Sequence, residues 1–324
     1  MSLRPESTKF PIIQALRGIA ALSVCWNHLT QSSALFPESS WISLSGRYGW
    51  VGVQVFFVIS GFIVPYSLFR GGYTIKCLFI FLWKRIVRVD PPYFVSLALA
   101  VVIAVLAAQS SMYVGKRPNF SLAEIAFHLG YLIPFVKARG YDWIVGAYWT
   151  LGVEFQYYVT LALLFPLIAS RSRHVRLSVY VALCIVPFFL PAPDFLPRHM
   201  PLFLMGISGM LRKSGITVQR EFWLTIGIAT TCAFVTMGPL ETSVGAATIA
   251  CIMNLERAPI ALLVVGDISY SLYLIHQPIG GRVVNLGGRF VPGAAVAMLP
   301  FVALAMVLLL SYAMYTFVER PAKR

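Results

Sequence analysis

The sequence predicts an all-α polytopic membrane protein with about ten transmembrane helices and both termini on the cytoplasmic side. Of its 324 residues, 58% are hydrophobic and only 12% are charged, whereas a soluble domain carries about 25% charged residues. Apolar runs of about 20 residues, the length that crosses a bilayer, recur along the chain. Lys and Arg gather in alternate loops, and this asymmetry marks the cytoplasmic side of a membrane protein.

The first of the expected spans is an apolar run near the N-terminus. We interpret it as a retained helix, because no small-residue cleavage site follows it. The segment 121–136 is also apolar, but it contains Glu124 and His128. Counted as a full span, this segment would also place the basic cluster of Arg171, Arg173 and Arg176 outside. We therefore expect an interfacial or re-entrant helix there, on the outer side, rather than an eleventh span. The expected spans are 12–30, 49–69, 92–109, 147–169, 177–192, 199–211, 222–238, 241–255, 259–279 and 292–317.

The basic excess of the chain follows this topology. With these spans, roughly two thirds of the Lys and Arg residues fall in cytoplasmic segments, which favours the N-in, C-in orientation. The formal net charge of +14 is thus an orientation signal, so we expect a lipid bilayer and no nucleic acid as partner. We predict a single integral-membrane domain over 1–324, with no fused extracytoplasmic domain. The five cysteines lack the paired spacing of zinc or redox sites, and no metal is expected.

Ionisable residues inside a span are costly and by default indicate a functional site. The first span contains two of them, Arg17 and His28. Eleven residues are close to three helical turns, so both side chains share one face, about 16 Å apart along the axis. They can line one cavity at two depths, with Arg17 nearer the cytoplasm. A snorkelling anchor for Arg17 and a structural hydrogen-bonded role for His28 are the alternatives.

A carboxylate is expected at the depth of His28. Glu154 lies one to two turns into a span that runs from outside to inside. A carboxylate and an imidazole at one level supply the parts of a general-base arrangement; a structural pair with an arginine is the alternative. Tyr157 and Tyr158, three and four residues later, extend the same face as candidate substrate-binding groups.

A basic cluster precedes a pair of prolines. Arg85 and Arg88 lie on adjacent helical rows just before Pro91 and Pro92, where we expect the helix to break. On the cytoplasmic side such a cluster can hold phosphates. A plain cytoplasmic loop that binds no ligand would carry the same residues.

A polar stripe is predicted on the span at 259–279. Ser269, Tyr273 and His276 stand at positions i, i+4 and i+7 and therefore share one helix face. This face is expected to point to the interior of the bundle. Spacing alone leaves two interpretations open, contact with substrate and packing against another span.

These residues lie in segments that resemble, in order, the motifs of acyltransferase family 3. This family comprises membrane-bound acyltransferases, among them bacterial polysaccharide and O-antigen O-acetyltransferases. The resemblance extends over nearly the whole chain, and the Arg-x10-His spacing of the first segment is typical of the family. Departures from the family pattern occur at Asn27, Gln14, Gln54 and Thr150. The matching segments are LRGIAALSVCWNH at 16–28, GVQVFFVISGF at 52–62, KRIVRVDPPY at 84–93, WTLGVEFQYY at 149–158, GDISYSLYLIHQPI at 266–279 and FVERP at 317–321.

The resemblance implies an O-acyltransferase of the bacterial cytoplasmic (inner) membrane. Such an enzyme moves an acyl group, usually acetyl, from cytoplasmic acetyl-CoA as co-substrate to a hydroxyl of a cell-surface or exported polysaccharide. Arg85, Arg88 and Arg17 would hold the CoA phosphates. His28 would take the proton of the acceptor hydroxyl, and Glu154 would orient His28 or bind the acceptor.

Several alternatives stay open from sequence. Transfer can be direct, or it can pass through an acyl group carried on His28. Trp149, near the outer face, can stack on a sugar ring or belong to an aromatic interface belt. A transporter or flippase for a lipid-linked sugar is a competing class, although such proteins often show internal repeats, and none is visible. A non-catalytic subunit of a polysaccharide export complex is the third class. The acceptor, the acyl chain length and a homo-oligomeric state are equally open.

Overall fold

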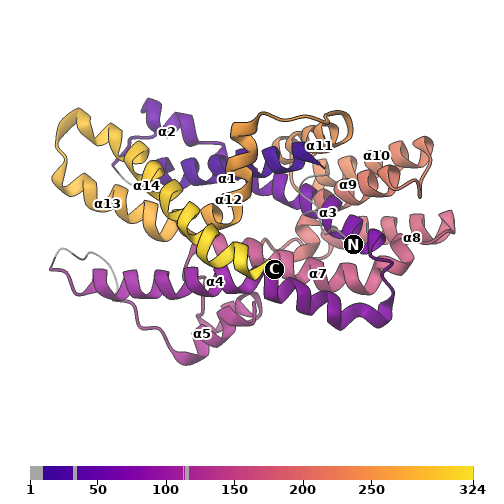
Figure 1. Ribbon diagram of the computed structural model, residues 1–324, viewed down its shortest axis with the longest axis horizontal. Coiled ribbons are helices and arrows are strands. Elements are labelled where there is room, and N and C mark those ends of the chain that lie inside the picture. Colours follow the sequence, from indigo (N-terminus) through magenta and orange to yellow (C-terminus); the bar gives the residue numbers. More distant parts are fainter. Residues whose placement is uncertain (1–9, 32–34, 112, 114–116, 324) are drawn as a thin grey trace. The chain divides into compact units, whose positions relative to one another are not determined.

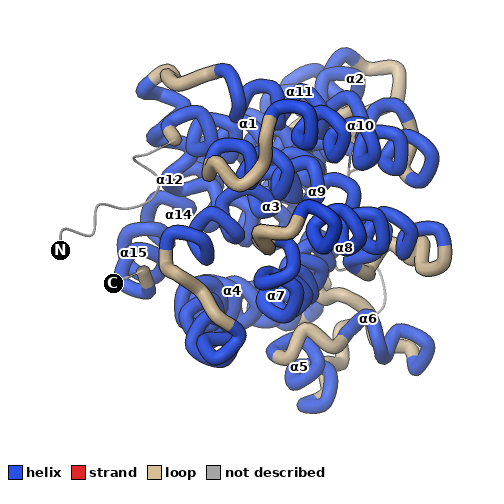
Figure 2. Tube along the Cα trace, turned by 90° about the vertical axis from the view of Figure 1, so that its right-hand side faces the viewer, coloured by secondary structure: helices blue, strands red, loops and turns tan. Residues whose placement is uncertain are grey.

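The computed structural model describes residues 10–31, 35–111, 113 and 117–323. Within them the regular structure is helical and no strand occurs, as Figures 1 and 2 show, which confirms the all-α prediction. The α-helices are α1 Pro11–Gln31, α2 Trp41–Gly46, α3 Gly52–Arg70, α4 Leu78–Ala108, α5 Leu122–Leu129, α6 Ile133–Val136, α7 Trp149–Ile168, α8 Arg173–Ile185, α9 Leu196–Lys213, α10 Gln219–Thr236, α11 Pro239–Asn254, α12 Ile260–Ile275, α13 Gly281–Phe290, α14 Leu299–Met314 and α15 Arg320–Ala322.

The helices form two compact units that alternate along the chain. The first unit comprises the described residues of Met1–Ala20, Val51–Lys84 and Val153–Gly266. The second unit comprises those of Ala21–Trp50, Arg85–Gly152 and Asp267–Arg324. Helices α1, α4, α7 and α12 contribute residues to both units. The single integral-membrane domain stays a prediction.

Five helical stretches in the described part of the chain are long and apolar enough to cross a membrane, by length and composition. Each of the ten expected spans contains a helix, but the number that cross stays a prediction, as does their orientation. The basic residues at 4, 9, 116 and 324, which enter the orientation argument, lie outside the described residues. The five stretches are Trp41–Arg70, Ile75–Ala108, Gly146–Ile168, Ile260–Phe290 and Gly293–Ala322.

Helix α4 continues through Pro91 and Pro92, so the expectation of a break at this pair is wrong. Each proline removes one helical hydrogen bond, but membrane helices tolerate this where neighbouring groups satisfy the backbone. A tertiary contact also holds this part of the helix, because the hydroxyl of Tyr270 donates to the carbonyl oxygen of Val89, just before the proline pair, at 2.8 Å. The basic cluster before the prolines is therefore part of a long helix.

The segment 121–136 folds into two short helices, α5 and α6, of eight and four residues. Both are far shorter than a bilayer-spanning helix. Tyr131, between them, has a φ of 55°, a left-handed conformation that turns the chain. Its hydroxyl donates to the carboxylate of Asp90 at 2.9 Å and so ties the segment to α4. The interfacial or re-entrant placement of this segment in a bilayer stays a prediction.

In the first unit, α3 packs along α9 through glycines. A Cβ at Gly61 would meet the backbone of Phe203, and a Cβ at Gly206 would meet the carbonyl oxygen of Val58. Small residues allow membrane helices to approach closely. The sequence motif around Gly61 thus has an architectural role.

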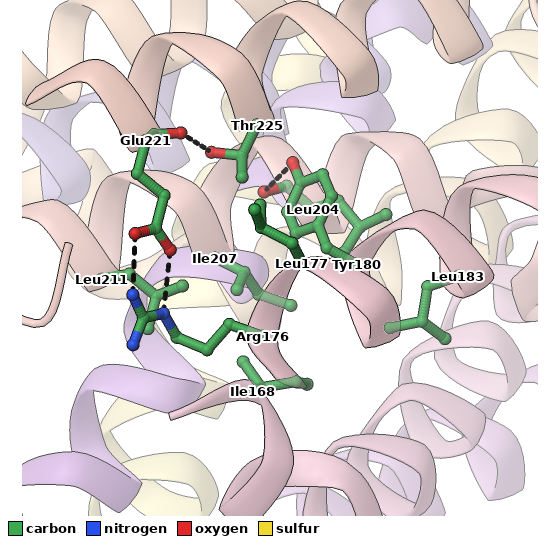
Figure 3. Close-up of a pocket in the computed structure, with 10 residues that line it drawn as sticks. All are labelled: Ile168, Arg176, Leu177, Tyr180, Leu183, Leu204, Ile207, Leu211, Glu221 and Thr225. Carbon is green, nitrogen blue, oxygen red and sulfur yellow. Dashed lines mark hydrogen bonds and ion pairs between the residues drawn. The ribbon is translucent and has the colours of Figure 1, made fainter. Parts of the chain in front are cut away.

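The first unit also contains a buried ion pair between α8 and α10. The guanidinium of Arg176 donates to both carboxylate oxygens of Glu221, at 2.8 and 2.7 Å. Its third nitrogen donates to the carbonyl oxygens of Ser170 and Arg171. Figure 3 shows the pair at the edge of a small, mainly apolar pocket. Arg176 and Glu221, which lie far apart in the sequence, therefore form a buried contact in the folded protein.

His128 on α5 is fully buried in the second unit. Its Nε2 accepts from the backbone N–H of Ile144 at 3.3 Å, and its Nδ1 lies 3.5 Å from the hydroxyl of Tyr93. Burial lowers the pKa of His128 to about 4, an effect that the nearby Asp142 partly offsets. The imidazole is therefore neutral in the folded protein over most of the physiological range.

This burial predicts an acid-sensitive fold. Because the unfolded chain takes up the proton at about pH 6.5, the free energy of unfolding falls as the pH is lowered from about 6.5 to about 4, by up to about 3 kcal/mol. Above about pH 6.5 the imidazole is neutral in both the folded and the unfolded chain, so His128 no longer lowers the free energy of unfolding. Unfolding of wild type and His128→Gln across this range would measure it. The difference between the two proteins should shrink toward pH 4, and a difference independent of pH would contradict the prediction.

Candidate functional site

Helix α1 is continuous over Pro11–Gln31, so Arg17 and His28 stand on one helix, as their spacing predicts. Both side chains are half-buried. Arg17 belongs to the first unit and His28 to the second. A half-buried imidazole is accessible to a reactant while part of its surface is held by protein; α1 is not among the five stretches that are long and apolar enough to cross a membrane, so the first span stays a prediction.

His28 has an imidazole neighbour in the second unit. The ring centre of His276 lies 5.1 Å from that of His28, with the planes tilted by 43°. His276 is fully buried and is the first residue of a π-helical turn, His276–Gly280, that follows α12. Such turns are frequent at functional sites. The tertiary structure thus joins two site residues that the sequence analysis placed in different spans.

A group of polar contacts holds this region of the second unit together. The hydroxyl of Tyr273 donates to the carbonyl oxygen of Ala147 at 3.0 Å and lies 2.8 Å from the hydroxyl of Thr150. The side-chain oxygen of Gln277 accepts from the N–H of Ala147 at 2.9 Å. These contacts fix the start of α7 against α12 and the π-helical turn. Tyr273 therefore positions the backbone around His276.

The C-terminal motif supports the same helix. Glu319 is fully buried, and one of its carboxylate oxygens accepts from the backbone N–H and the hydroxyl of Ser271. The other oxygen pairs with Lys323 at 2.6 Å. The acidic residue of FVERP is thus an anchor for α12. The sequence analysis assigned it no role.

Glu154 has hydroxyl partners in the first unit. One of its carboxylate oxygens accepts from Ser60 on α3 at 3.0 Å and from Tyr158 at 2.5 Å. Tyr157 points elsewhere, and its ring stacks on that of Phe203 with centres 4.1 Å apart. Tyr158 thus contacts the carboxylate of Glu154, whereas the ring of Tyr157 packs against Phe203. Contact of either tyrosine with a substrate stays a prediction. The sequence analysis missed Ser60, whose only signal is that it is polar in an apolar run.

Arg85 and Arg88 lie on consecutive turns of α4. Arg85 is half-buried and Arg88 is exposed. Their three-residue spacing places both guanidinium groups on one side of the helix, where they can contact one anionic ligand. They lie in a helix and not in the loop that the sequence predicted, and contact with a phosphate stays a prediction.

The two remaining candidate substrate-binding residues, Ser269 and Trp149, lie on α12 and α7. Ser269 is fully buried on α12 and Trp149 is half-buried at the start of α7, and contact of either with a substrate stays a prediction. Glu154 belongs to the first unit and His28 to the second. The pairing of this carboxylate with His28 likewise stays a prediction.

Comparison with known proteins assigns the chain to a family. The acyltransferase domain family of type 3 matches residues 10–316. The chain belongs to this acyltransferase family. It is accordingly an enzyme of the acyltransferase class, and the family resemblance inferred from the motifs is confirmed. The match includes every candidate site residue named above.

Three relatives of this acyltransferase are informative. It is 22% identical to acyltransferase MdmB of Streptomyces mycarofaciens, over 99% of this chain and 93% of the relative. It is 29% identical to exopolysaccharide production protein ExoZ of Rhizobium meliloti, over 85% and 90%. It is 23% identical to O-acetyltransferase OatA of Staphylococcus aureus, over 97% of this chain and 57% of the relative, so it spans little more than half of OatA. No solved structure matches the chain.

Proposed function

We propose that this acyltransferase moves an acetyl group from cytoplasmic acetyl-CoA to a hydroxyl of an exported or cell-surface polysaccharide in the bacterial inner membrane. The imidazole of His28, half-buried beside His276, is the observation that carries this proposal. Two relatives, named as an O-acetyltransferase and as an exopolysaccharide production protein, support the choice of acetyl group and acceptor. The apolar helices support a location in the membrane.

The chemistry needs one base and one thioester. A neutral nitrogen of His28 takes the proton of the acceptor hydroxyl as the hydroxyl oxygen forms a bond to the acyl carbon. The carbon–sulfur bond then breaks, and the proton passes to the departing CoA thiolate. The products are an ester and free CoA. In this scheme Glu154, with Ser60 and Tyr158 on one oxygen, binds the acceptor or orients the base.

Three arginines are proposed to hold the donor. Acetyl-CoA carries phosphates at one end, and guanidinium groups form charge-assisted hydrogen bonds to phosphate. Arg85 and Arg88 supply two such groups on one side of α4, and Arg17 supplies a third on α1.

This donor site predicts a binding defect. We expect Arg85→Gln and Arg88→Gln each to raise the KM for acetyl-CoA about 10-fold or more, because a hydrogen bond to a charged group contributes about 1.5–3 kcal/mol. The kcat should change little. Steady-state kinetics with purified protein would measure both constants, with Arg173→Gln, an exposed arginine on α8, as control. An unchanged KM in both variants would refute a phosphate site at these residues.

The function itself is tested by label transfer. Purified wild-type protein is incubated with radiolabelled acetyl-CoA and a crude bacterial polysaccharide fraction, and label in the polysaccharide is counted. Protein-dependent label that mild alkali releases, as it would an ester, is the expected result. A well-folded protein that neither binds nor consumes acetyl-CoA would refute the proposed donor.

A further inference from the structure

A buried imidazole nitrogen next to the reactive histidine lacks a hydrogen-bond partner. The Nδ1 of His276 lies 2.7 Å from the carbonyl oxygen of Tyr273. A carbonyl oxygen only accepts, so this nitrogen carries the hydrogen. Nε2 of the neutral ring is then an acceptor, and among the described residues it has no hydrogen-bond partner. A buried acceptor left in this state destabilises the folded protein.

The neighbour of this nitrogen can supply the missing donor. Two imidazoles joined edge to edge by one N–H···N hydrogen bond have ring centres about 5 Å apart. The rings of His28 and His276 are 5.1 Å apart. Rotation of the ring about the last torsion of a histidine side chain crosses only low barriers, because that torsion is broad. The separation of the ring centres therefore suits a hydrogen bond from an N–H group of His28 to Nε2 of His276 after a turn of the His28 ring.

We propose that His276 is the positioning residue of His28, a role that rests on the proposed function. Nε2 of His276 accepts the N–H of His28, which leaves the opposite nitrogen of His28 as the one with a lone pair. That nitrogen faces the acceptor hydroxyl. The carboxylate of a catalytic triad orients its histidine in the same way, but here the orienting group is a neutral ring.

The local fold supports this role. The π-helical turn begins at His276, and Gln277 and Tyr273 both contact Ala147 in the turn just before α7. The bond to the Tyr273 carbonyl holds the His276 ring in one tautomer. These contacts hold a buried imidazole beside His28 with its Nε2 available as an acceptor.

The test is a double-mutant cycle on acetyl transfer to the polysaccharide fraction. His276→Phe retains a ring without an acceptor, and His276→Gln places a side-chain oxygen near the position of Nε2. We expect His276→Phe to lower kcat 10- to 100-fold with both KM values unchanged, and His276→Gln to recover most of kcat. In a His28→Ala background, His276→Phe should have no further effect, because it acts through His28.

The controls separate this role from packing and from the proposed function. Leu274→Ala removes a fully buried side chain of the same helix, and its effect should be the same with and without His28. An effect of His276→Phe that persists undiminished in the His28→Ala background would overturn the positioning role, as would a full loss of kcat in His276→Gln protein that is folded. Absence of label transfer by wild type would instead overturn the proposed function, and the role of His276 with it.

Discussion

Glu221→Ala is expected to destabilise the protein by about 3–5 kcal/mol, the cost of leaving one partner of a buried ion pair uncompensated. Arg176 and Glu221 are 8% and 3% exposed, and each carboxylate oxygen accepts from the guanidinium. Removal of the carboxylate leaves a guanidinium buried between α8 and α10, whose partners among the described residues are then the backbone carbonyls of Ser170 and Arg171. Thermal unfolding of detergent-solubilised protein should show a Tm lower by several degrees and a smaller folded yield.

A paired replacement separates charge from packing. In Arg176→Met with Glu221→Leu no charge stays buried, and apolar residues of similar volume often restore or raise stability. This protein should therefore unfold closer to wild type than Glu221→Ala does. A Tm for Glu221→Ala equal to that of wild type would show that water or a backbone shift relieves the buried charge.

His28→Ala is expected to lower kcat for acetyl transfer by about 10²- to 10⁴-fold, the range that a positioned general base contributes. The imidazole is half-buried, so its loss should change stability much less than activity. Label transfer from acetyl-CoA measures the effect, and size-exclusion chromatography checks the fold.

A matched histidine supplies the control for this substitution. His174 is exposed on α8 and has no place in the proposed chemistry, so His174→Ala should retain wild-type kcat. Full activity in folded His28→Ala protein would refute the mechanism. If label instead accumulates on wild-type protein and is absent from His28→Ala, transfer passes through an acyl group on the histidine.

Much of this arrangement could be predicted from local patterns. Apolar length predicts helices because a chain in a bilayer must satisfy its own backbone, and each expected span contains one. The Arg-x10-His spacing places both side chains on one face of α1, since helical periodicity depends only on neighbouring residues. The order of short motifs was sufficient to predict the acyltransferase family.

Other features depend on contacts between distant segments. Ser60 and Glu154 are 94 residues apart and share a hydrogen bond. The partner of Arg176 lies 45 residues away, although the sequence indicates only a basic loop. Pro91 and Pro92 predict a helix end from their missing N–H groups, yet α4 continues through them, and Tyr270, 181 residues from Val89, contacts the helix just before the pair.

The sequence by itself determined the helical membrane architecture, the family and the helices that carry each site residue, because hydrophobic length and helical periodicity are local properties. Only the tertiary structure decided that His276 lies beside His28, that Ser60 and Tyr158 share a carboxylate oxygen of Glu154, and that Glu221 neutralises Arg176. These pairings require segments far apart in the chain to pack together, and side-chain complementarity across the fold, rather than spacing along it, selects them.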